Sequence, residues 1–323
     1  MASTASKVYI DPELAAIRAQ LPPMPAGLLD FNDMAASRAR MAGRRPIFPP
    51  LESVEAQDRT IPGPAGEPDV KVRIYRAKLA QPDTRVPGIF WIHGGGMVMG
   101  GLDGDNVRLS EWVEQIGCVA VSVDYRLAPE NPHPAPVEDC YAALVWTAQH
   151  ADELGIDPAR LAIAGASAGG GLGAAASLMA RDRGGPALCY QLLIYPMLDD
   201  RNITPSSYEI TSVGVWDRAT NQGGWRALLG DQVGTEGVSH YAAPARATDL
   251  SGLPPAYIDV GTADLFRDED IDYAQRLMQA GVPTELHVYP GAFHGFEGVA
   301  PNAKLTQAAR SLRLSALQRA LAR

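Results

Sequence analysis

The chain of 323 residues has few cysteines and no excess of basic residues, and each shortage argues against a class of protein. Its three cysteines, Cys118, Cys140 and Cys189, lie far apart, whereas a disulfide framework or a zinc site needs more cysteines at closer spacing. We expect them to be small buried hydrophobic residues. With 28 basic and 37 acidic residues the net charge is −9, which argues against nucleic-acid binding, because phosphate contacts need clustered Lys and Arg.

Long apolar runs are also missing from the chain. No stretch approaches the roughly 18 apolar residues of a membrane-spanning helix. Residues 1–20 have no basic start followed by an apolar segment, so we expect no secretory signal. These absences predict a cytoplasmic protein without a membrane span. The length is enough for one large α/β domain with a smaller appendage.

Apolar runs alternate with helical patterns along most of the chain. Continuous apolar segments, typical of strands buried on both faces, occupy 88–93, 118–123, 161–164, 188–195 and 255–260. Helical patterns occupy 106–116, 136–150, the segment after Ser167, 269–280 and 302–321. This alternation predicts an α/β fold with a doubly wound, mostly parallel sheet.

Other segments extend this prediction at both ends of the chain. Residues 53–60 and 70–75 alternate polar and apolar side chains, as half-exposed antiparallel strands do. A last strand is expected at 284–289. Apolar spacing in 12–20 and 33–42 suggests two short helices at the N-terminus.

The alternation lapses between residues 199 and 248, where the chain is a series of short, mixed pieces. A connection between two strands needs far fewer residues, and functional loops and lids account for most insertions of this size. We therefore predict a cap over the catalytic face, built from 1–50 and 199–248. Residues 51–198 and 249–323 would form the catalytic domain.

A short motif at residues 165–169 is the strongest functional signal. It reads Gly-Ala-Ser-Ala-Gly, a G-x-S-x-G pattern, between the apolar run 161–164 and a helix of small residues. Strand, sharp turn and helix is the context of a nucleophile elbow, a strained turn that exposes a serine at the end of a sheet. The residues two before and two after the serine must be very small, and glycine meets that need. Ser167 is therefore the candidate nucleophile.

A serine nucleophile needs a base and an acid that orients the base. In this topology they follow in the order serine, acid, histidine. Of the three histidines after Ser167, His287 lies inside a predicted strand and His240 inside the predicted cap. His294 lies in a glycine-flanked loop at 290–296, just after a strand, so it is the candidate base.

The candidate acid should follow the preceding strand. Asp264 is the carboxylate that lies just beyond the strand at 255–260. Asp268 and Glu269 are better explained as charges at a helix N-terminus, where the helix dipole favours them. Asp259 lies inside the strand and is expected to be structural.

Residues 93–96 read His-Gly-Gly-Gly and follow an apolar strand, as the oxyanion loop of such enzymes does. Without side chains, successive amides can converge on one developing oxyanion. The predicted donors are the amides of Gly95, Gly96 and Ala168. A phosphate cradle is disfavoured, because neither G-x-G-x-x-G nor a Walker lysine accompanies the glycines. His93 precedes the nucleophile and is expected to support the loop through a hydrogen bond.

Together these segments resemble the hormone-sensitive-lipase-like esterases, bacterial family IV of the α/β-hydrolases. The resemblance covers most of 70–321 and includes Tyr-Arg-Leu-Ala-Pro-Glu at 125–130. It implies an eight-stranded sheet, a helical cap, hydrolysis of short- to medium-chain acyl esters without a cofactor, and a tendency to form homodimers. No metal is expected. The resemblance maps the triad onto Ser167, Asp264 and His294, and the oxyanion amides onto Gly95, Gly96 and Ala168.

Three positions depart from the family pattern. Ala166 precedes the serine where Asp or Thr is usual, Met97 follows the glycines where an aromatic residue is frequent, and Leu265 follows the acid where Pro is usual. The first change puts in doubt a hydrogen bond around the elbow. The second suggests a differently shaped pocket wall, because a thioether side chain is flexible.

The predicted activity is that of a serine carboxylesterase acting on a small-molecule ester. An amidase, deacetylase or arylformamidase would use the same triad, because the fold and the triad do not define the leaving group. A non-catalytic receptor on this scaffold would typically lack a triad member, whereas all three are present here. Five residues are candidates either for the substrate pocket or for the core of the cap: Met97, Met197, Leu198, Trp216 and Trp225.

Overall fold

The computed structural model describes residues 8–20, 29–42, 47–79, 85–211, 213 and 215–322. Within them, eight strands form a sheet in the order β1-β2-β4-β3-β5-β6-β7-β8, in which β2 runs antiparallel to its neighbours and the others are parallel. The strands are β1 (Val54–Ile61), β2 (Val70–Ala77), β3 (Val86–Ile92), β4 (Val119–Asp124), β5 (Ile156–Ala166), β6 (Tyr190–Ile194), β7 (Ala256–Ala263) and β8 (Thr284–Phe293). The predicted α/β fold with an eight-stranded, mostly parallel sheet is confirmed.

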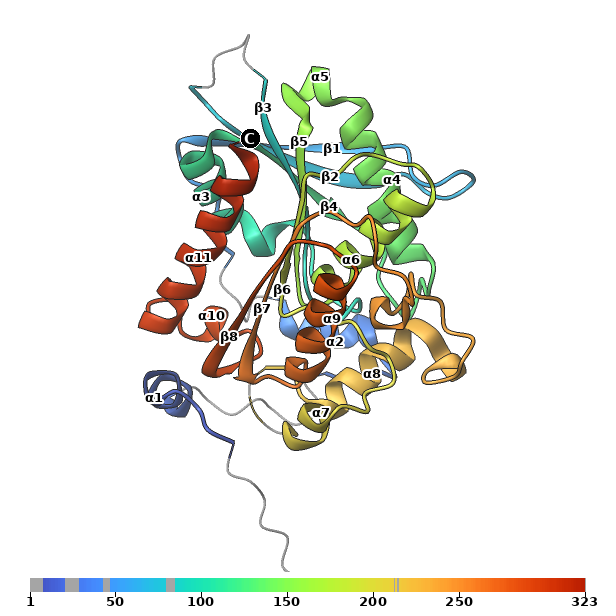
Figure 1. Ribbon diagram of the computed structural model, residues 1–323, viewed down its shortest axis with the longest axis vertical. Helices are drawn as coiled ribbons and strands as arrows, with labels where there is room; N and C mark the ends of the chain where they lie inside the picture. Colours follow the sequence, from blue (N-terminus) through green and yellow to red (C-terminus); the bar gives the residue numbers. More distant parts are fainter. Residues whose placement is uncertain are drawn as a thin grey trace, which may run out of the picture.

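Helices cover both faces of this sheet (Figure 1). One layer holds α3 and α11, and the other holds α4, α6 and α9. The described α-helices are α1 (Pro12–Gln20), α2 (Met34–Met41), α3 (Asn106–Trp112), α4 (Ala135–Gln149), α5 (Ala151–Leu154), α6 (Ala168–Asp182), α7 (Pro205–Glu209), α8 (Arg218–Leu229), α9 (Arg267–Gln279), α10 (Phe296–Val299) and α11 (Lys304–Leu321). None of the helices in the described ranges combines the length and the apolar character needed to cross a bilayer.

Strand β3 shows why the central segments read as continuous apolar runs. Ile89 and Trp91 point into the core formed with α3 and α11. Phe90 and Ile92 alternate with them and point into the core formed with α4 and α6. All four are fully buried, because a central parallel strand is covered on both faces.

The prediction for β8 was wrong in its end point. The sequence pattern ends the strand at residue 289, but β8 continues to Phe293 and pairs there with Ala263. The register shifts between Gly261 and Ala263, and Gly291 adopts a φ of +74°, so a bulge carries the strand through the Pro-Gly pair. Pro290 fits because β8 is an edge strand.

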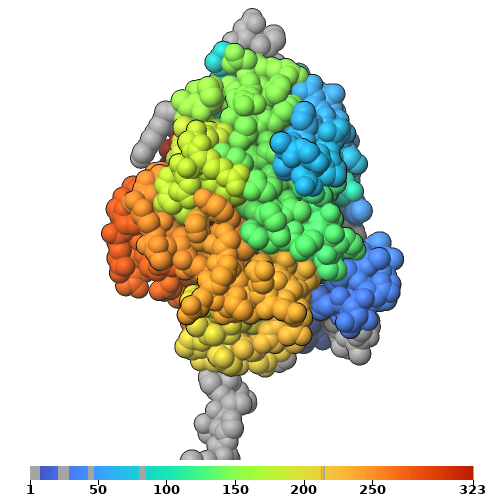
Figure 2. Space-filling view, turned by 90° about the vertical axis from the view of Figure 1, so that its right-hand side faces the viewer, coloured from blue at the N-terminus to red at the C-terminus, as the bar shows by residue number. Residues whose placement is uncertain are grey.

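The helices outside the sheet lie in two places. In Figure 1, α2, α7 and α8 lie together at the lower end of the molecule, and Figure 2 shows α2 in blue beside the yellow and orange segment of the insertion. Met34 of α2 shares a core with Trp225 and Leu228 of α8. By contrast, α1 lies beside α10 and α11, where Glu13 accepts the backbone N–H of Lys304 at 2.9 Å.

The predicted burial of the cysteines is confirmed for two of the three. Cys118 and Cys140 are buried and Cys189 is half-buried. All three are free thiols in the described part of the chain.

Candidate active site

The turn between β5 and α6 holds Ser167 in a strained backbone conformation, with φ +57° and ψ −121°. Two glycines make the turn sterically feasible. A Cβ on Gly165 would lie 2.2 Å from the carbonyl oxygen of Gly169, and a Cβ on Gly169 would lie 2.1 Å from that of Ile92. Any larger residue at either position would collide with backbone, which explains the G-x-S-x-G spacing.

Ser167, His294 and Asp264 form a continuous hydrogen-bonded chain. His294 Nε2 lies 2.9 Å from Ser167 Oγ, and His294 Nδ1 lies 2.8 Å from Asp264 Oδ2. Asp264 follows β7 and His294 follows β8, so the carboxyl ends of neighbouring parallel strands bring them together. Ser167 is 8% exposed and His294 5% exposed, whereas Asp264 is fully buried. These contacts have the geometry that a nucleophile, a base and a group that orients the base require.

Neighbouring groups fix the positions of the Asp264 carboxylate and the His294 ring. Asp264 Oδ1 accepts the backbone N–H of Phe266 at 3.0 Å. The rings of Tyr195 and Phe266 meet the imidazole of His294 edge-on, with centroids at 4.7 and 5.0 Å. These contacts restrict rotation of the imidazole.

The other histidines lie outside this chain of hydrogen bonds. His287 Nε2 lies 2.8 Å from the Glu285 carboxylate within β8, and His240 is 42% exposed on the surface. His93 is buried and stacks on Tyr125 at 4.3 Å, with Nδ1 2.8 Å from the carbonyl oxygen of Gly94. Burial lowers the pKa of His93, which favours the neutral imidazole.

Of the two acidic residues predicted to be helix-end charges at the start of α9, Glu269 does not lie where the prediction placed it. Asp268 accepts the backbone N–H of Ser206 at 2.7 Å and pairs with Arg267. Glu269 is not an exposed helix-end charge: it is 2% exposed, and its Oε1 accepts the backbone N–H of Leu198 at 2.8 Å. Burial raises the pKa of Glu269. The sequence carried no signal for this burial, because it depends on where the loop after β6 passes.

The glycine-rich turn after β3 lies directly against Ser167. A Cβ on Gly94 would lie 3.4 Å from Ser167 Cβ. Gly95 and Gly96 adopt φ values of +121° and +63°, which glycine tolerates and most other residues do not. The backbone hydrogen bonds of the turn leave the amides of Gly95, Gly96 and Ala168 without an acceptor among the described residues.

Comparison with known proteins identifies the family. A family model described as an alpha/beta hydrolase fold matches residues 89–298. The chain belongs to the hormone-sensitive-lipase-like α/β-hydrolases. This α/β-hydrolase is 38% identical to esterase LipI of Mycobacterium tuberculosis, over 91% of this chain and 90% of the relative. It is 36% identical to carboxylesterase NlhH of the same species, over 98% of each chain.

Solved structures agree with these relatives. A bacterial heroin esterase superposes with a TM-score of 0.88 at 40% identity, covering 97% of this chain and 98% of that one. Esterase LipW from Mycobacterium marinum superposes with a TM-score of 0.80 at 37% identity, covering 97% and 96%. Both sets of relatives support the assignment of this α/β-hydrolase as a carboxylic ester hydrolase.

Four of the five candidate pocket residues lie in one core cluster, together with α4, α6 and α8; they are Met97, Met197, Trp216 and Trp225. Leu198 lies in a different cluster, packed with α6 and α9. The ring of Trp216 covers the glycine-rich turn so closely that a Cβ on Gly96 would lie 2.1 Å from it. Trp216 Nε1 donates to Asn221 Oδ1 at 3.1 Å, which holds the ring in this position.

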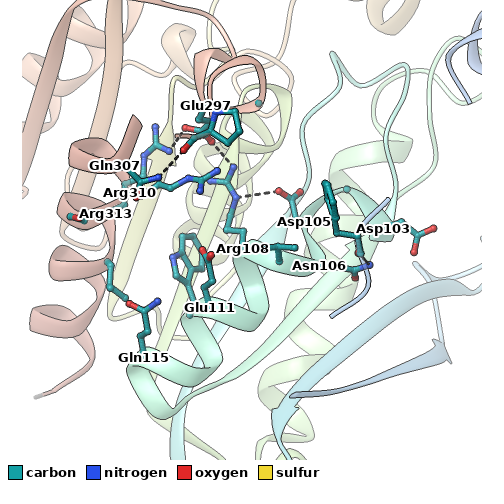
Figure 3. Close-up of a pocket in the computed structure, with 18 residues that line it drawn as sticks. Asp103, Asp105, Asn106, Arg108, Glu111, Gln115, Glu297, Gln307, Arg310 and Arg313 are labelled. Carbon is teal, nitrogen blue, oxygen red and sulfur yellow. Dashed lines mark hydrogen bonds and ion pairs between the residues drawn. The ribbon is translucent and has the colours of Figure 1, made fainter. Parts of the chain in front are cut away.

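This α/β-hydrolase also has a buried ionic network, and sequence reasoning missed most of it; Figure 3 shows the part formed by Arg108, Glu297 and Arg313. Arg313 is 1% exposed and donates from Nε to Asp259 Oδ2 at 2.6 Å, so Asp259 is structural, as its place in the strand predicted. Glu297, three residues after His294, binds both Arg313 and Arg108. Burial opposes ionisation of Glu297, but these two arginines hold its pKa well below its ordinary range.

This network borders a cavity of about 610 Å³ between α3, α10 and α11. None of Ser167, Asp264 and His294 lines the cavity. Two of its lining arginines, Arg108 and Arg313, are already paired with internal carboxylates. In the described ranges, no group of three or more His, Cys, Asp or Glu residues is placed to hold a metal ion.

Proposed function

We propose that this α/β-hydrolase cleaves short- to medium-chain acyl esters through Ser167, His294 and Asp264, by way of an acyl-enzyme. The observation that carries the proposal is the chain of two hydrogen bonds, 2.8 Å from Asp264 to His294 and 2.9 Å from His294 to Ser167. The relatives named as esterases support the reaction class.

In the first half of the reaction, Ser167 Oγ attacks the ester carbonyl carbon while His294 Nε2 takes the hydroxyl proton. Asp264 orients the imidazole and stabilises its transient positive charge. The carbon–oxygen bond to the alcohol then breaks, and the alcohol leaves with the proton from His294. In the second half, His294 takes a proton from water as the water attacks the acyl-enzyme, and Ser167 recovers a proton when the carboxylic acid departs.

The negative oxygen that forms in each half needs hydrogen-bond donors. The amides of Gly95, Gly96 and Ala168 are the donors that we propose, since they border Ser167 and have no acceptor among the described residues. An oxyanion hole of this kind is often a large part of the rate acceleration, because its dipoles are already oriented before the reaction.

The substrate pocket is the least defined part of the proposal. Trp216, held by Asn221 against Gly96, would close one side of the acyl pocket, and Met97 would form the adjacent wall. A bulky ring so close to the oxyanion turn favours short acyl chains. We further propose that 1–50 and 199–248 act as a cap; of these, residues 1–7, 21–28, 43–46, 212 and 214 lie outside the described ranges.

The proposal is tested with p-nitrophenyl esters of increasing acyl length, from C2 to C16, on the wild type and on Ser167→Ala. We expect turnover to peak between C2 and C8 and to fall by at least ~10⁴-fold in the variant, because removal of the nucleophile leaves only the oxyanion hole and binding. Ser177→Ala is the matched control: Ser177 is also buried in α6, but its hydroxyl binds the carbonyl oxygen of Gly173.

Three results would contradict the proposal. Substantial turnover by Ser167→Ala would exclude the acyl-enzyme mechanism. Cleavage of amides or formamides with no cleavage of any ester would replace the substrate class while keeping the triad. If the wild type cleaved none of these substrates and a serine-reactive phosphonate failed to label it, a non-catalytic binding role would be favoured.

A further inference from the structure

Arg38 of α2 reaches from the N-terminal segment into two loops of the sheet. Its Nε donates to the carbonyl oxygen of Val98 at 2.7 Å, and its Nη2 donates to the carbonyl oxygen of Ala128 at 2.7 Å. Both Nη atoms also donate to the carboxylate of Glu130, at 2.7 and 2.8 Å. One guanidinium therefore joins three segments that are far apart in sequence.

The two carbonyl acceptors belong to residues that are themselves hydrogen-bonded to the glycine-rich turn. Val98 lies two residues after Gly96, and its N–H donates to the carbonyl oxygen of Gly95 at 3.1 Å. The N–H of Ala128 donates to the carbonyl oxygen of Met97 at 2.9 Å. Val98 is therefore bonded directly to Gly95, and Ala128 is bonded to Met97, the residue that follows Gly96.

The contacts require an arginine. Val98 and Ala128 are fully buried, so their carbonyl oxygens need donors from the protein, and an unpaired buried carbonyl is costly. A guanidinium offers five donors in a rigid fork, whereas a lysine ammonium is a single point that cannot meet both carbonyls and the carboxylate. The ion pair itself contributes little, because the Glu130 side chain is 48% exposed.

We propose that Arg38 is a positioning residue for the oxyanion turn: it fixes Val98 and Ala128, and through them the amides of Gly95 and Gly96. This inference rests on the proposed function, since it assumes that these amides stabilise the oxyanion. It assigns α2 a part in catalysis in addition to its place in the proposed cap.

The test compares Arg38→Ala and Arg38→Lys with Arg183→Ala. Arg183 is the matched control, because it also forms a two-bond pair with a surface carboxylate, Glu138, and it otherwise lies over the rings of Tyr141 and Tyr241, away from the turn. We expect kcat to fall roughly ten- to a hundredfold in Arg38→Ala with KM little changed, because a small displacement of catalytic donors has effects of this size. Arg38→Lys should recover part of the loss, and Arg183→Ala should stay within about twofold of wild type.

A trifluoromethyl ketone supplies a readout that a merely structural role would not move. It forms a hemiketal oxyanion on the serine, so its affinity should fall in Arg38→Ala by about the same factor as kcat/KM. Glu130→Gln should change neither value by more than about twofold, since the exposed ion pair is weak. An equal loss in Glu130→Gln and Arg38→Ala would overturn the proposed role of the carbonyl contacts.

The outcomes separate this inference from the proposed function. Wild-type kcat and ketone affinity in Arg38→Ala, with Ser167→Ala inactive, would overturn the role of Arg38 alone. An active Ser167→Ala would instead remove the proposed mechanism. If Arg38→Ala does not fold, Arg38→Lys decides: reduced kcat and reduced ketone affinity at an unchanged melting temperature support the inference, and wild-type values overturn it.

Discussion

Two aspartates of the same strand region have opposite surroundings. Asp259 lies within β7 and Asp264 directly after it, and both are fully buried. Asp264 faces His294, and its chain of hydrogen bonds ends at the hydroxyl of Ser167. Asp259 faces Arg313, and its chain continues to Glu297, where two arginines meet. The partner, not the residue type, decides what each carboxylate does.

The difference follows from what each partner can do with a proton. An imidazole gains and loses a proton near neutral pH, so the chain through Asp264 can assist a reaction. A guanidinium keeps its proton, so the chain through Asp259 can only hold charges in place. A buried ion pair of this kind is strongly destabilising when one partner is removed, because a charge is left without compensation.

Breaking the catalytic side of this comparison should have the largest effect. In Asp264→Asn the imidazole loses its carboxylate, and we expect kcat/KM to fall by about 10⁴-fold, because the tautomer and the charge stabilisation are both lost. The melting temperature should change by only a few degrees. Ester kinetics and thermal unfolding of the same preparation check both values. A loss below about tenfold would contradict the role of Asp264 as the orienting acid.

Breaking the structural side should give the reverse result. In Asp259→Asn we expect the free energy of unfolding to fall by about 3–5 kcal/mol, because Arg313 is left buried with less compensation. The kcat of the folded fraction should stay within about threefold of wild type. Urea unfolding measures the first and ester hydrolysis at low temperature the second. Inactivation without loss of stability would place Asp259 in the catalytic machinery and end the contrast.

Asp270 adds a third case to the comparison, because no cationic side chain among the described residues donates a hydrogen bond to its carboxylate. Asp270 in α9 is fully buried, and neither carboxylate oxygen has a hydrogen-bond partner among the described residues. Burial raises the pKa of Asp270 well above its ordinary value, and the nearby carboxylates of Glu269, Asp264 and Asp259 raise it further. The folded state therefore binds a proton that the unfolded state releases, and stability must fall as the pH rises above about 3.9 towards the folded pKa.

Replacement of Asp270 should have the smallest effect of the three, and it should stabilise the protein, whereas replacement of Asp259 should destabilise it. Asp270→Asn removes the titration, so the variant should gain stability relative to wild type as the pH rises from 5 to 8, by at most about 1.4 kcal/mol per pH unit. Chemical unfolding of both proteins across this range measures the difference. A constant difference at all pH values would show that Asp270 does not titrate there, and Glu269→Gln would then be examined for the same slope.

Much of the fold and the catalytic centre could be predicted from local patterns. Strand and helix periods located the strands and the helices that cover the sheet, but not the short helices α5 and α10 or the helices α7 and α8 of the insertion. The glycines around Ser167 marked the elbow because backbone contact there excludes larger residues. The order of serine, acid and histidine singled out Asp264 and His294, which the structure brings within hydrogen-bond distance. The end of β8 was misread, since the bulge at Gly261 depends on pairing with a neighbouring strand.

What the sequence by itself determined is therefore local: the period of each element, the strained turn, and the order of the residues that carry chemistry. Only the tertiary structure decided which charges are buried and what meets them. Arg38 finds its carbonyls and Arg108 finds Glu297 across long stretches of chain, and Glu269 is buried by a loop that follows another strand. Backbone sterics and side-chain period act over a few residues, whereas burial and ion pairing depend on which distant segments the fold brings into contact.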